Sequence, residues 1–325
     1  MAAEIIDGKA VAAELKQRTA QEAHELAEQG KTPYLVAVQV GDDPAARMYA
    51  GMQQKNCRSV GIRYELQTLP PDVAENELLA HISMLNTSAE VTGILLQMPL
   101  PEHIDTRKAQ LAISQDKDVE GIHPAQMGKL FYGEAQVAPC TPLASIELLS
   151  RVSQHWEGKQ AVVVGHSEIL GKPLAMLLLQ SRRHAPTVTI CHVATRDLAS
   201  HTRNADILIV GAGVAQAKWQ RWKNLPDPQK TAPPDLWPLI GREMIKPGAV
   251  IIDVAINRIP VGFDHSGQPL ADDAGKIRMQ TVGDVDFAAA CELASAVTPV
   301  PGGVGPVTVA MLLRNIIVLA KRNLR

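Results

Sequence analysis

Short apolar runs alternate along this chain with segments in which apolar residues recur at helical spacing. This alternation is typical of parallel strands connected by helices. Aromatic residues make up only 3% of the chain, which suits buried parallel strands built from Val, Ile, Leu and Ala. In the first part we expect helices over Gly8–Gly30, Pro44–Val60 and Glu75–Leu85 and strands over Leu35–Val40, Tyr64–Leu69 and Gly93–Gln97.

The rest of the chain predicts a second doubly wound α/β unit, because 325 residues are too many for one ordinary core. A helix is expected to begin at Pro139–Pro142, with proline in its first turn. The last segment, Val307–Asn323, predicts an amphipathic helix that docks onto another element. Four strands are expected between them: Gln160–Gly165, Thr187–Cys191, Ile207–Val210 and Val250–Val254.

The segment Lys218–Leu239 interrupts this rhythm. It holds Trp219, Trp222 and Trp237 together with five prolines, and it has no strand pattern. Long loops of this kind are uncommon in compact domains. The tryptophans favour a packed excursion, whose role the sequence leaves open.

Composition narrows the class of protein. The net charge of −2 and the lack of a basic stripe argue against a nucleic-acid partner. The four cysteines are far apart, so we expect reduced thiols and no metal site. The N-terminus has no secretory pattern, and no apolar run approaches the length needed to cross a bilayer. A cytoplasmic protein without membrane association is predicted.

Two glycine turns point to a nucleotide. The run Ala161–Gly165 leads into a turn that contains Gly171 and opens a helix, and Val210–Gly213 ends a later strand in a second turn. Glycine lets the backbone approach a pyrophosphate, whose charge a helix N-terminus favours. The spacing is not the usual dinucleotide fingerprint. Together, however, the turns predict a phosphate-binding edge at the switch point of the sheet.

Motifs spread over almost the whole chain carry a resemblance to a known family. The most specific is Thr298–Pro306, a nine-residue string dense in Gly and Pro. The others are Val38–Pro44, Tyr49, Gly93–Pro101, Asp116–Gly121, Pro139–Pro142, Gly165–Pro173, Val282–Asp286, Thr308 and Asn315. The chain resembles the bifunctional methylenetetrahydrofolate dehydrogenase/cyclohydrolases.

The resemblance implies two domains with a cleft between them. Residues 1–143 with 300–325 correspond to the folate domain, and residues 144–299 to a Rossmann-like domain for NAD or NADP. In the family, methylenetetrahydrofolate gives a hydride to the nicotinamide, and water then opens the methenyl product. Family members usually form homodimers through the nucleotide domain, so a homodimer is expected.

Family residues for folate map onto this chain with two departures. The resemblance implies that Tyr49 stacks on the pterin and that Gln97 acts beside it. The Lys of the cyclohydrolase step is replaced by Gln53, and the Asp that binds the pterin edge is replaced by Glu120. Lys55 lies about 200° from Gln53 around a helix and cannot substitute for that Lys. Further expected substrate contacts are Met98, Pro99, Pro301, Gly302 and Gly305.

The cofactor side also departs from the family. Where NADP-dependent members place an Arg and a Ser near the 2′-phosphate, this chain has His166 and Val193. No acidic residue replaces them, so the choice between NAD and NADP stays open. Ala255 stands where the family usually has Gly. The expected cofactor contacts are Thr141, Gly165, His166, Ser167, Ile169, Gly171, Val193, Gly211, Ala212, Ala255, Ile256 and Thr308.

The leading interpretation is therefore a methylenetetrahydrofolate dehydrogenase whose cyclohydrolase activity is lost or weak and which works with a separate cyclohydrolase. Three alternatives remain. The enzyme is bifunctional through another base, or it acts on a modified one-carbon substrate, or it is a folate- and nucleotide-binding homologue without turnover.

Overall fold

The computed structural model describes residues 2–42, 44–153, 155–180, 184–226 and 234–322, and the chain forms two compact units. The first unit comprises Ala10–Cys140 and Thr308–Arg325, and the second comprises Met1–Lys9 and Thr141–Val307. The resemblance assigns residues 1–143 with 300–325 to the folate domain, whereas residues 1–9, 141–143 and 300–307 lie in the second unit by this division. Residues 1–9 lie there because the edge strand β1 (Glu4–Ile5) of the second unit pairs with β11 (Ala296–Val297).

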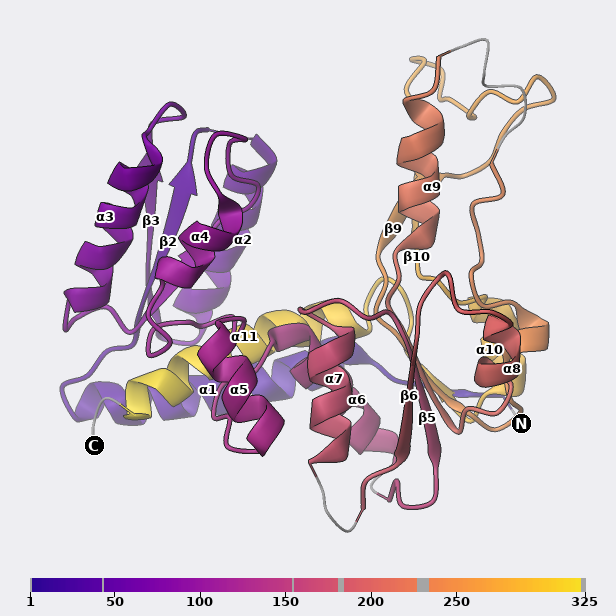
Figure 1. Cartoon of the computed structure of the whole chain (residues 1–325), viewed down its shortest axis with the longest axis horizontal. Helices are drawn as coiled ribbons and strands as arrows, with labels where there is room; N and C mark the ends of the chain where they lie inside the picture. Colours follow the sequence, from indigo (N-terminus) through magenta and orange to yellow (C-terminus); the bar gives the residue numbers. More distant parts are fainter. Residues whose placement is uncertain (1, 43, 154, 181–183, 227–233, 323–325) are drawn as a thin grey trace. The chain divides into compact units, whose positions relative to one another are not determined.

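A three-stranded parallel sheet in the order β3-β2-β4 forms the centre of the first unit (Figure 1). Its strands are β2 (Tyr34–Val40), β3 (Arg63–Leu69) and β4 (Gly93–Leu96). Its helices are α1 (Gly8–Glu28), α2 (Pro44–Ser59), α3 (Glu75–Thr87), α4 (Thr106–Ala112), α5 (Pro124–Tyr132) and α11 (Val304–Arg322).

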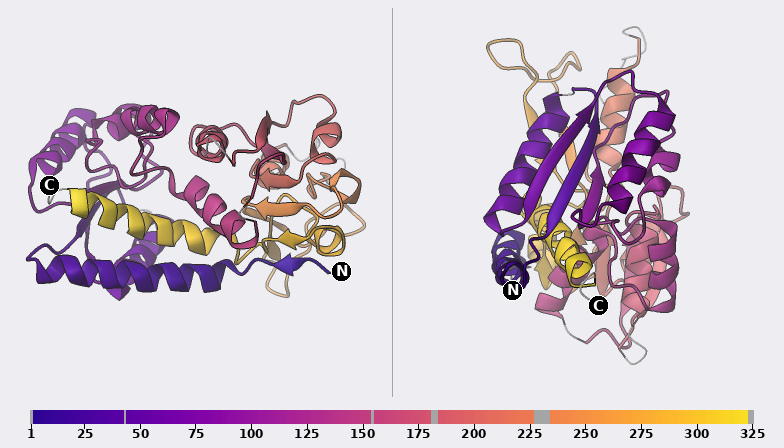
Figure 2. Two further views of the ribbon diagram at one scale, coloured as in Figure 1. Left: turned by 90° about the horizontal axis from the view of Figure 1, so that it is seen from below. Right: turned by 90° about the vertical axis from the view of Figure 1, so that its left-hand side faces the viewer.

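Both faces of this sheet are covered, because alternate residues of a strand point to opposite sides. Leu35 and Ala37 of β2 pack with α1 and α11, whereas Val36 and Val38 pack with α3 and α4. Helices α1 and α11 lie side by side (Figure 2), and Lys321 Nζ bonds Glu22 Oε2 at 2.6 Å. The expected docking of the last helix is therefore confirmed.

The second unit is built on a six-stranded parallel sheet in the order β1-β11-β8-β7-β5-β6. The chain runs from β5 to β6 on one side and then crosses to β7 on the other, so the switch point lies between β5 and β7. The remaining elements are α6 (Cys140–Val152), β5 (Gln160–Val164), α7 (Gly171–Leu179), β6 (Thr187–Cys191), α8 (Leu198–Thr202), β7 (Ile207–Val210), α9 (Val214–Lys223), η2 (Arg242–Met244), β8 (Val250–Asp253), β9 (Asn257–Pro260), β10 (Met279–Val282) and α10 (Phe287–Leu293).

The tryptophan-rich segment is packed, as expected, but it begins as a helix. Trp219 and Trp222 lie on α9, where their ring centroids stack 5.5 Å apart, and both are buried. Trp237 joins the same cluster and donates from Nε1 to Gly283 O at 2.8 Å. The cluster packs on the antiparallel pair β9–β10, which the sequence pattern did not predict. Residues 227–233 lie outside the described residues.

Helix α11 departs from the expectation that no apolar run of this chain approaches the length of a membrane span. It is long and apolar enough to meet a membrane-span criterion, with a mean hydropathy of 1.6 over its most apolar window. Of that window, 56% is buried inside the protein. Leu313, Ile316 and Ile317 belong to the core of the first unit. Helix α11 is therefore a core helix of the first unit, although its length and hydropathy would also allow it to span a membrane.

Candidate active site

A pocket of about 270 Å³ opens in the first unit, where β4 ends. Tyr49 and Gln53 reach it from α2, Gln97 and Met98 follow β4, and Glu120 comes from the segment beside β4. Thr308, Val309 and Leu312 of α11 complete the wall with Asn56 and Cys140. Ligands of α/β sheets bind at the carboxyl ends of the strands, so this position favours a binding site.

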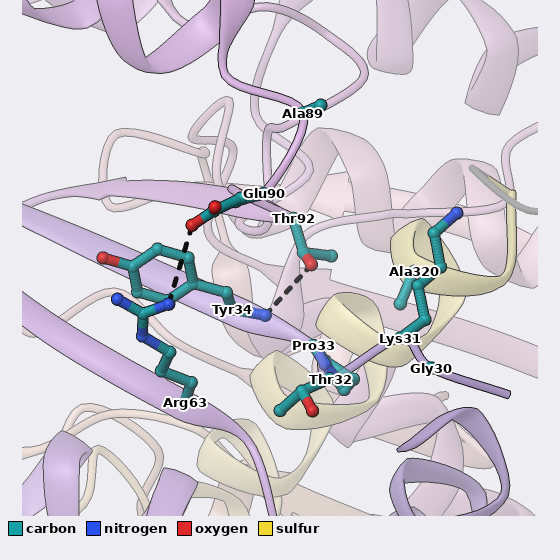
Figure 3. A pocket seen from close by; sticks show the side chains of 10 residues that line it. All are labelled: Gly30, Lys31, Thr32, Pro33, Tyr34, Arg63, Ala89, Glu90, Thr92 and Ala320. Atoms are coloured by element: carbon teal, nitrogen blue, oxygen red, sulfur yellow. Dashed lines mark hydrogen bonds and ion pairs between the residues drawn. The ribbon is translucent and has the colours of Figure 1, made fainter. Parts of the chain in front are cut away.

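A second pocket of about 430 Å³ lies at the opposite, amino ends of the same strands (Figure 3). The charged side chains of Arg63 and Glu90 in this pocket already contact each other. Arg63 lies 4.0 Å from the ring centroid of Tyr34, and its Nη1 lies 3.7 Å from Glu90 Oε2. Tyr34 N donates to Thr92 Oγ1 at 3.0 Å. Position and pairing both favour the smaller pocket as the reactive site.

Gln53 is a buried member of a polar cluster. Only 7% of it is exposed, and its Oε1 accepts hydrogen bonds from Gln97 Nε2 at 2.6 Å and from Tyr64 Oη at 3.3 Å. Tyr49 lies one helical turn earlier and is 49% exposed, which leaves its ring available at the pocket wall. Lys55 is exposed and does not line the pocket. The cluster thus unites Gln53 and Gln97, as expected.

Glu120 is held by a turn around Asp118. The Asp118 carboxylate accepts from the backbone N–H groups of Glu120 at 3.2 Å, Gly121 at 3.0 Å and His123 at 2.8 Å. Burial, followed by the charge of Asp118, raises the pKa of Glu120 to about 7. Burial and the charge of Glu120 raise the pKa of Tyr49. The pocket therefore holds a carboxyl group that changes its charge near neutral pH.

Asn315 of α11, a residue of the family motif pattern, connects α11 to two segments near the pocket. Its Nδ2 donates to Val119 O at 2.9 Å and to Ala138 O at 3.1 Å, so α11 fixes the segments that carry Glu120 and Cys140. Asn56 and Cys140 were also missed as lining residues. The helical spacing of Thr308, Leu312 and Asn315 is the signal that one face of α11 serves this pocket.

Of the other residues expected to contact the substrate, some line this pocket and others lie elsewhere. Met98 lines the pocket, whereas Pro99 is exposed and is not among its lining residues. Pro301, Gly302 and Gly305 belong to the second unit. Thr308, expected at the cofactor, lines the pocket of the first unit, and Thr141 begins the second-unit part of α6.

In the second unit, glycine is required at the switch point. Gly165 has φ +133°, and a Cβ there would lie 2.8 Å from Gly211 O. A Cβ on Gly171 would lie 1.9 Å from Gly165 O. Only glycine permits this close approach of turn and helix start. The backbone cradle fits a pyrophosphate group at the start of α7.

Exposed side chains along the same edge fit the rest of a dinucleotide. Ile169, Val193 and Ile256 are 62%, 64% and 61% exposed, and they follow β5, β6 and β8. Ligand sites commonly offer such apolar surfaces to planar rings. His166 and Ser167 are also exposed, and Ala255 is buried.

The second glycine turn has another role than the one expected. The N–H groups of Ala212 and Gly213 each donate to Asp284 Oδ2 at 2.8 Å. Asp284 Oδ1 accepts from Asn257 Nδ2 at 2.9 Å. These amides bind the protein's own carboxylate, so they do not form a second phosphate cradle. Asp284 instead fixes the turn against Gly165.

Family models match both units. The catalytic domain of tetrahydrofolate dehydrogenase/cyclohydrolase matches residues 6–120, and its NAD(P)-binding domain matches residues 139–222 and 237–324. The chain belongs to the tetrahydrofolate dehydrogenase/cyclohydrolase family. It is 42% identical over 322 residues to the bifunctional protein FolD of Cupriavidus pinatubonensis, covering 99% of each chain.

Solved structures of the family agree with this assignment. A bifunctional FolD from Campylobacter jejuni has a TM-score of 0.81 and 37% identity, covering 99% of both chains. A Trypanosoma brucei FolD, complexed with NADP cofactor and inhibitor, has a TM-score of 0.80 and 33% identity, covering 100% of this chain and 99% of that one. The predicted family, two-domain α/β fold and NAD(P)-binding domain are thereby confirmed.

Proposed function

We propose that this family member oxidises methylenetetrahydrofolate to the methenyl compound with NAD(P) and hydrolyses that product only weakly. One observation carries the second part of the proposal. The side chain at the position of the cyclohydrolase Lys is the amide of Gln53, which is buried and bonded to Gln97 Nε2 at 2.6 Å.

Hydride transfer demands little of the chain beyond alignment. Gly165 and the start of α7 would hold the pyrophosphate of NAD(P)⁺, which would supply the hydride acceptor for the methylene carbon. Tyr49, half exposed at the pocket wall, offers a ring face to the pterin. Glu120 supplies a carboxylate to the N–H groups of the pterin edge. Positioning of this kind is itself a large part of catalysis.

Hydrolysis demands a proton acceptor as well. Water adds to the methenyl carbon and must lose a proton before the ring opens. An amide has no lone pair that takes up a proton near neutral pH, and Gln53 Oε1 already accepts two hydrogen bonds. Loss of general acid–base help removes about two to four orders of magnitude in rate.

The wild-type enzyme tests this proposal directly. We expect reduction of NAD⁺ or NADP⁺ with methylenetetrahydrofolate, measured by nicotinamide absorbance. We expect hydrolysis of methenyltetrahydrofolate close to the rate in buffer alone. Binding of both ligands without hydride transfer would overturn the enzyme assignment. Hydrolysis as fast as dehydrogenase turnover would overturn the predicted loss.

A bifunctional enzyme with another base is the second candidate, and Lys16 is the observation that favours it. Lys16 Nζ donates to Oδ1 of Asn56, a pocket-lining residue, at 2.7 Å, and burial lowers the pKa of Lys16. If wild-type hydrolysis is fast, Lys16→Met identifies this base by abolishing it. A modified one-carbon substrate or a homologue without turnover has no comparable observation in its favour.

The pH dependence of folate binding should report Glu120. Its pKa of about 7 lies above the ordinary value of 4.5, so the carboxylate is present above pH 7 and is lost as the pH falls through 7. The dissociation constant for tetrahydrofolate should therefore rise as the pH drops from 8 to 6, by up to about tenfold per unit below the pKa. Calorimetric titration measures it.

Two variants make this measurement specific. Glu120→Gln should flatten the pH dependence, whereas Glu134→Gln changes an exposed carboxylate outside the pocket and should leave it unchanged. A wild-type dissociation constant that is constant between pH 6 and 8 would contradict the role of Glu120.

We further propose a cytoplasmic homodimer that hands its methenyl product to a separate cyclohydrolase. The family resemblance supports the dimer, and the weak hydrolysis proposed here supports the separate enzyme. Sedimentation of the purified chain tests the dimer, and a monomer would exclude it. We also propose that residues 144–299 form the core of the nucleotide domain.

A further inference from the structure

We propose that Met52 and Met98 form an oxidation site at the mouth of the pocket in the first unit, where a peroxide converts their thioethers to sulfoxides and thereby weakens folate binding. The inference rests on the proposed function, because it assumes that this pocket takes folate. It adds a reversible modification that the proposed hydride transfer does not itself require.

Three residues with exposed side chains form the mouth of this pocket. Tyr49, Met52 and Met98 line it and are 49%, 49% and 44% exposed. Tyr49 and Met52 are three residues apart on α2, so they lie on the same face of that helix. Met98 follows β4. The other lining residues are buried or half-buried. An entering ligand therefore meets two thioethers together with the ring of Tyr49.

Exposed thioethers react with a peroxide in preference to the thiols of this chain. Burial raises the pKa of all four thiols, those of Cys57, Cys140, Cys191 and Cys291. A thiol reacts with a peroxide as its thiolate, which a raised pKa makes scarce. A thioether has no proton to lose, so its exposure governs its reaction.

The chemical step is a two-electron transfer of one oxygen atom. A lone pair of the methionine sulfur attacks the terminal oxygen of the peroxide, and the S–O bond forms as the O–O bond breaks. The proton of the attacked hydroxyl moves to the leaving oxygen, which departs as water or an alcohol. The sulfur is oxidised and the peroxide is reduced. Thiol-dependent methionine sulfoxide reductases reverse this change.

A sulfoxide alters what the mouth of the pocket can bind. A thioether is apolar and makes favourable contacts with the edge of an aromatic ring. A sulfoxide oxygen is a hydrogen-bond acceptor that water solvates in the open mouth. A folate ring stacked on Tyr49 would displace that water from Met52 and Met98. Because Val309 and Leu312 on the pocket wall have no donor group to replace it, burial of the oxygen is unfavourable.

The distribution of methionines confines this effect to one unit. The exposed methionines among the described residues all lie in the first unit, and they are Met48, Met52, Met84 and Met98. Met48 and Met84 do not line the pocket, which makes them matched controls. No methionine that the structure describes in the second unit is exposed. Oxidation should therefore weaken folate binding and spare nucleotide binding.

The test measures oxidation and binding on the same full chain. Hydrogen peroxide is applied to the folded protein and removed with catalase, and peptide mass spectrometry reports which methionines have gained an oxygen. We expect sulfoxide at Met52 and Met98. Calorimetry should then show tetrahydrofolate binding about tenfold more weakly than to untreated protein, because an unpaired polar group is buried. The affinity for 5′-ADP should change by less than about twofold. A methionine sulfoxide reductase should restore the folate affinity.

Two double variants assign the effect. Met52→Leu/Met98→Leu should keep its own folate affinity after peroxide, because leucine has a similar volume and no sulfur. Met48→Leu/Met84→Leu should lose about tenfold, as the wild type does. If untreated protein does not bind tetrahydrofolate, the proposed function fails. The oxidation site is overturned if folate binds but Met52 and Met98 stay unoxidised while Met48 and Met84 react. It is also overturned if their oxidation leaves the affinity unchanged, if Met52→Leu/Met98→Leu is weakened like the wild type, or if 5′-ADP binding falls equally.

Discussion

Gln53→Lys is expected to raise methenyltetrahydrofolate hydrolysis by about 10²-fold or more, because it restores a titratable amine. Polar groups that could contact a lysine side chain already surround position 53. Gln97 and Tyr64 already direct polar atoms at this position, and Glu120 is a carboxyl group that lines the same pocket. Gln97 can rotate its amide so that its oxygen accepts from the new amine. The increase should be larger when Glu120→Asp is added, since this shortens the carboxylate by one methylene.

The matched control is Gln54→Lys, the same change on the exposed neighbouring residue. It should leave hydrolysis at the wild-type level. Dehydrogenase turnover measured in the same preparations shows that the pocket is still formed. Folded Gln53→Lys protein that oxidises its substrate but hydrolyses no faster than the Gln54→Lys variant would show that position 53 does not limit the reaction.

Asp284→Ala is expected to destabilise the second unit by about 3–5 kcal/mol and to abolish measurable nucleotide binding. The carboxylate accepts hydrogen bonds from Ala212 N, Gly213 N and Asn257 Nδ2, and Asp284 itself is fully buried. Its removal leaves the buried amide of Asn257 and two part-buried backbone N–H groups without this acceptor, at about 1–3 kcal/mol for each. The turn next to Gly165 also loses its anchor.

Asp286→Ala provides the comparison two residues away. Asp286 caps α10 by accepting from Ala289 N at 3.1 Å, and loss of such a cap costs about 1 kcal/mol. All four tryptophans belong to the second unit, so their fluorescence in urea follows that unit alone. Equal midpoints for the two variants would contradict the role given to Asp284.

The strands predicted from the sequence agree with the structure where a strand is buried and is followed by glycine or proline. Leu35–Val40 and Gln160–Gly165 were predicted within a residue of β2 and β5, because each holds four consecutive apolar residues. The hairpin β9–β10 was missed because β9 is short, holds Arg258 and ends in proline. The first residues of the segment Lys218–Leu239 belong to α9, which ends at Lys223. Helical spacing continues up to that residue, because the prolines begin only after it.

The candidate site was predictable in its residue types but not in its bonding. Tyr49, Gln53 and Gln97 were expected together from the motifs. The burial of Gln53 depends on Gln97 and Tyr64, which come from other elements of the fold. Likewise, no local signal reveals that Asp284 occupies the amides of a turn some 70 residues earlier, at sequence separations of 71 and 72. Such contacts are properties of the tertiary structure.

The pairing of β1 with β11 has a consequence for synthesis on the ribosome. Glu4 lies opposite Ala296, and Asn315 reaches back to Val119 across 196 residues. Proteins are made from the N-terminus at about 5–20 residues per second, and early segments normally fold as they emerge. Here β1 has no strand partner until β11 is translated, and the wall that carries Glu120 has no anchor until α11 is translated. The pocket that Glu120 lines is therefore completed late in synthesis, and a chain that is interrupted before α11 lacks one wall of that pocket.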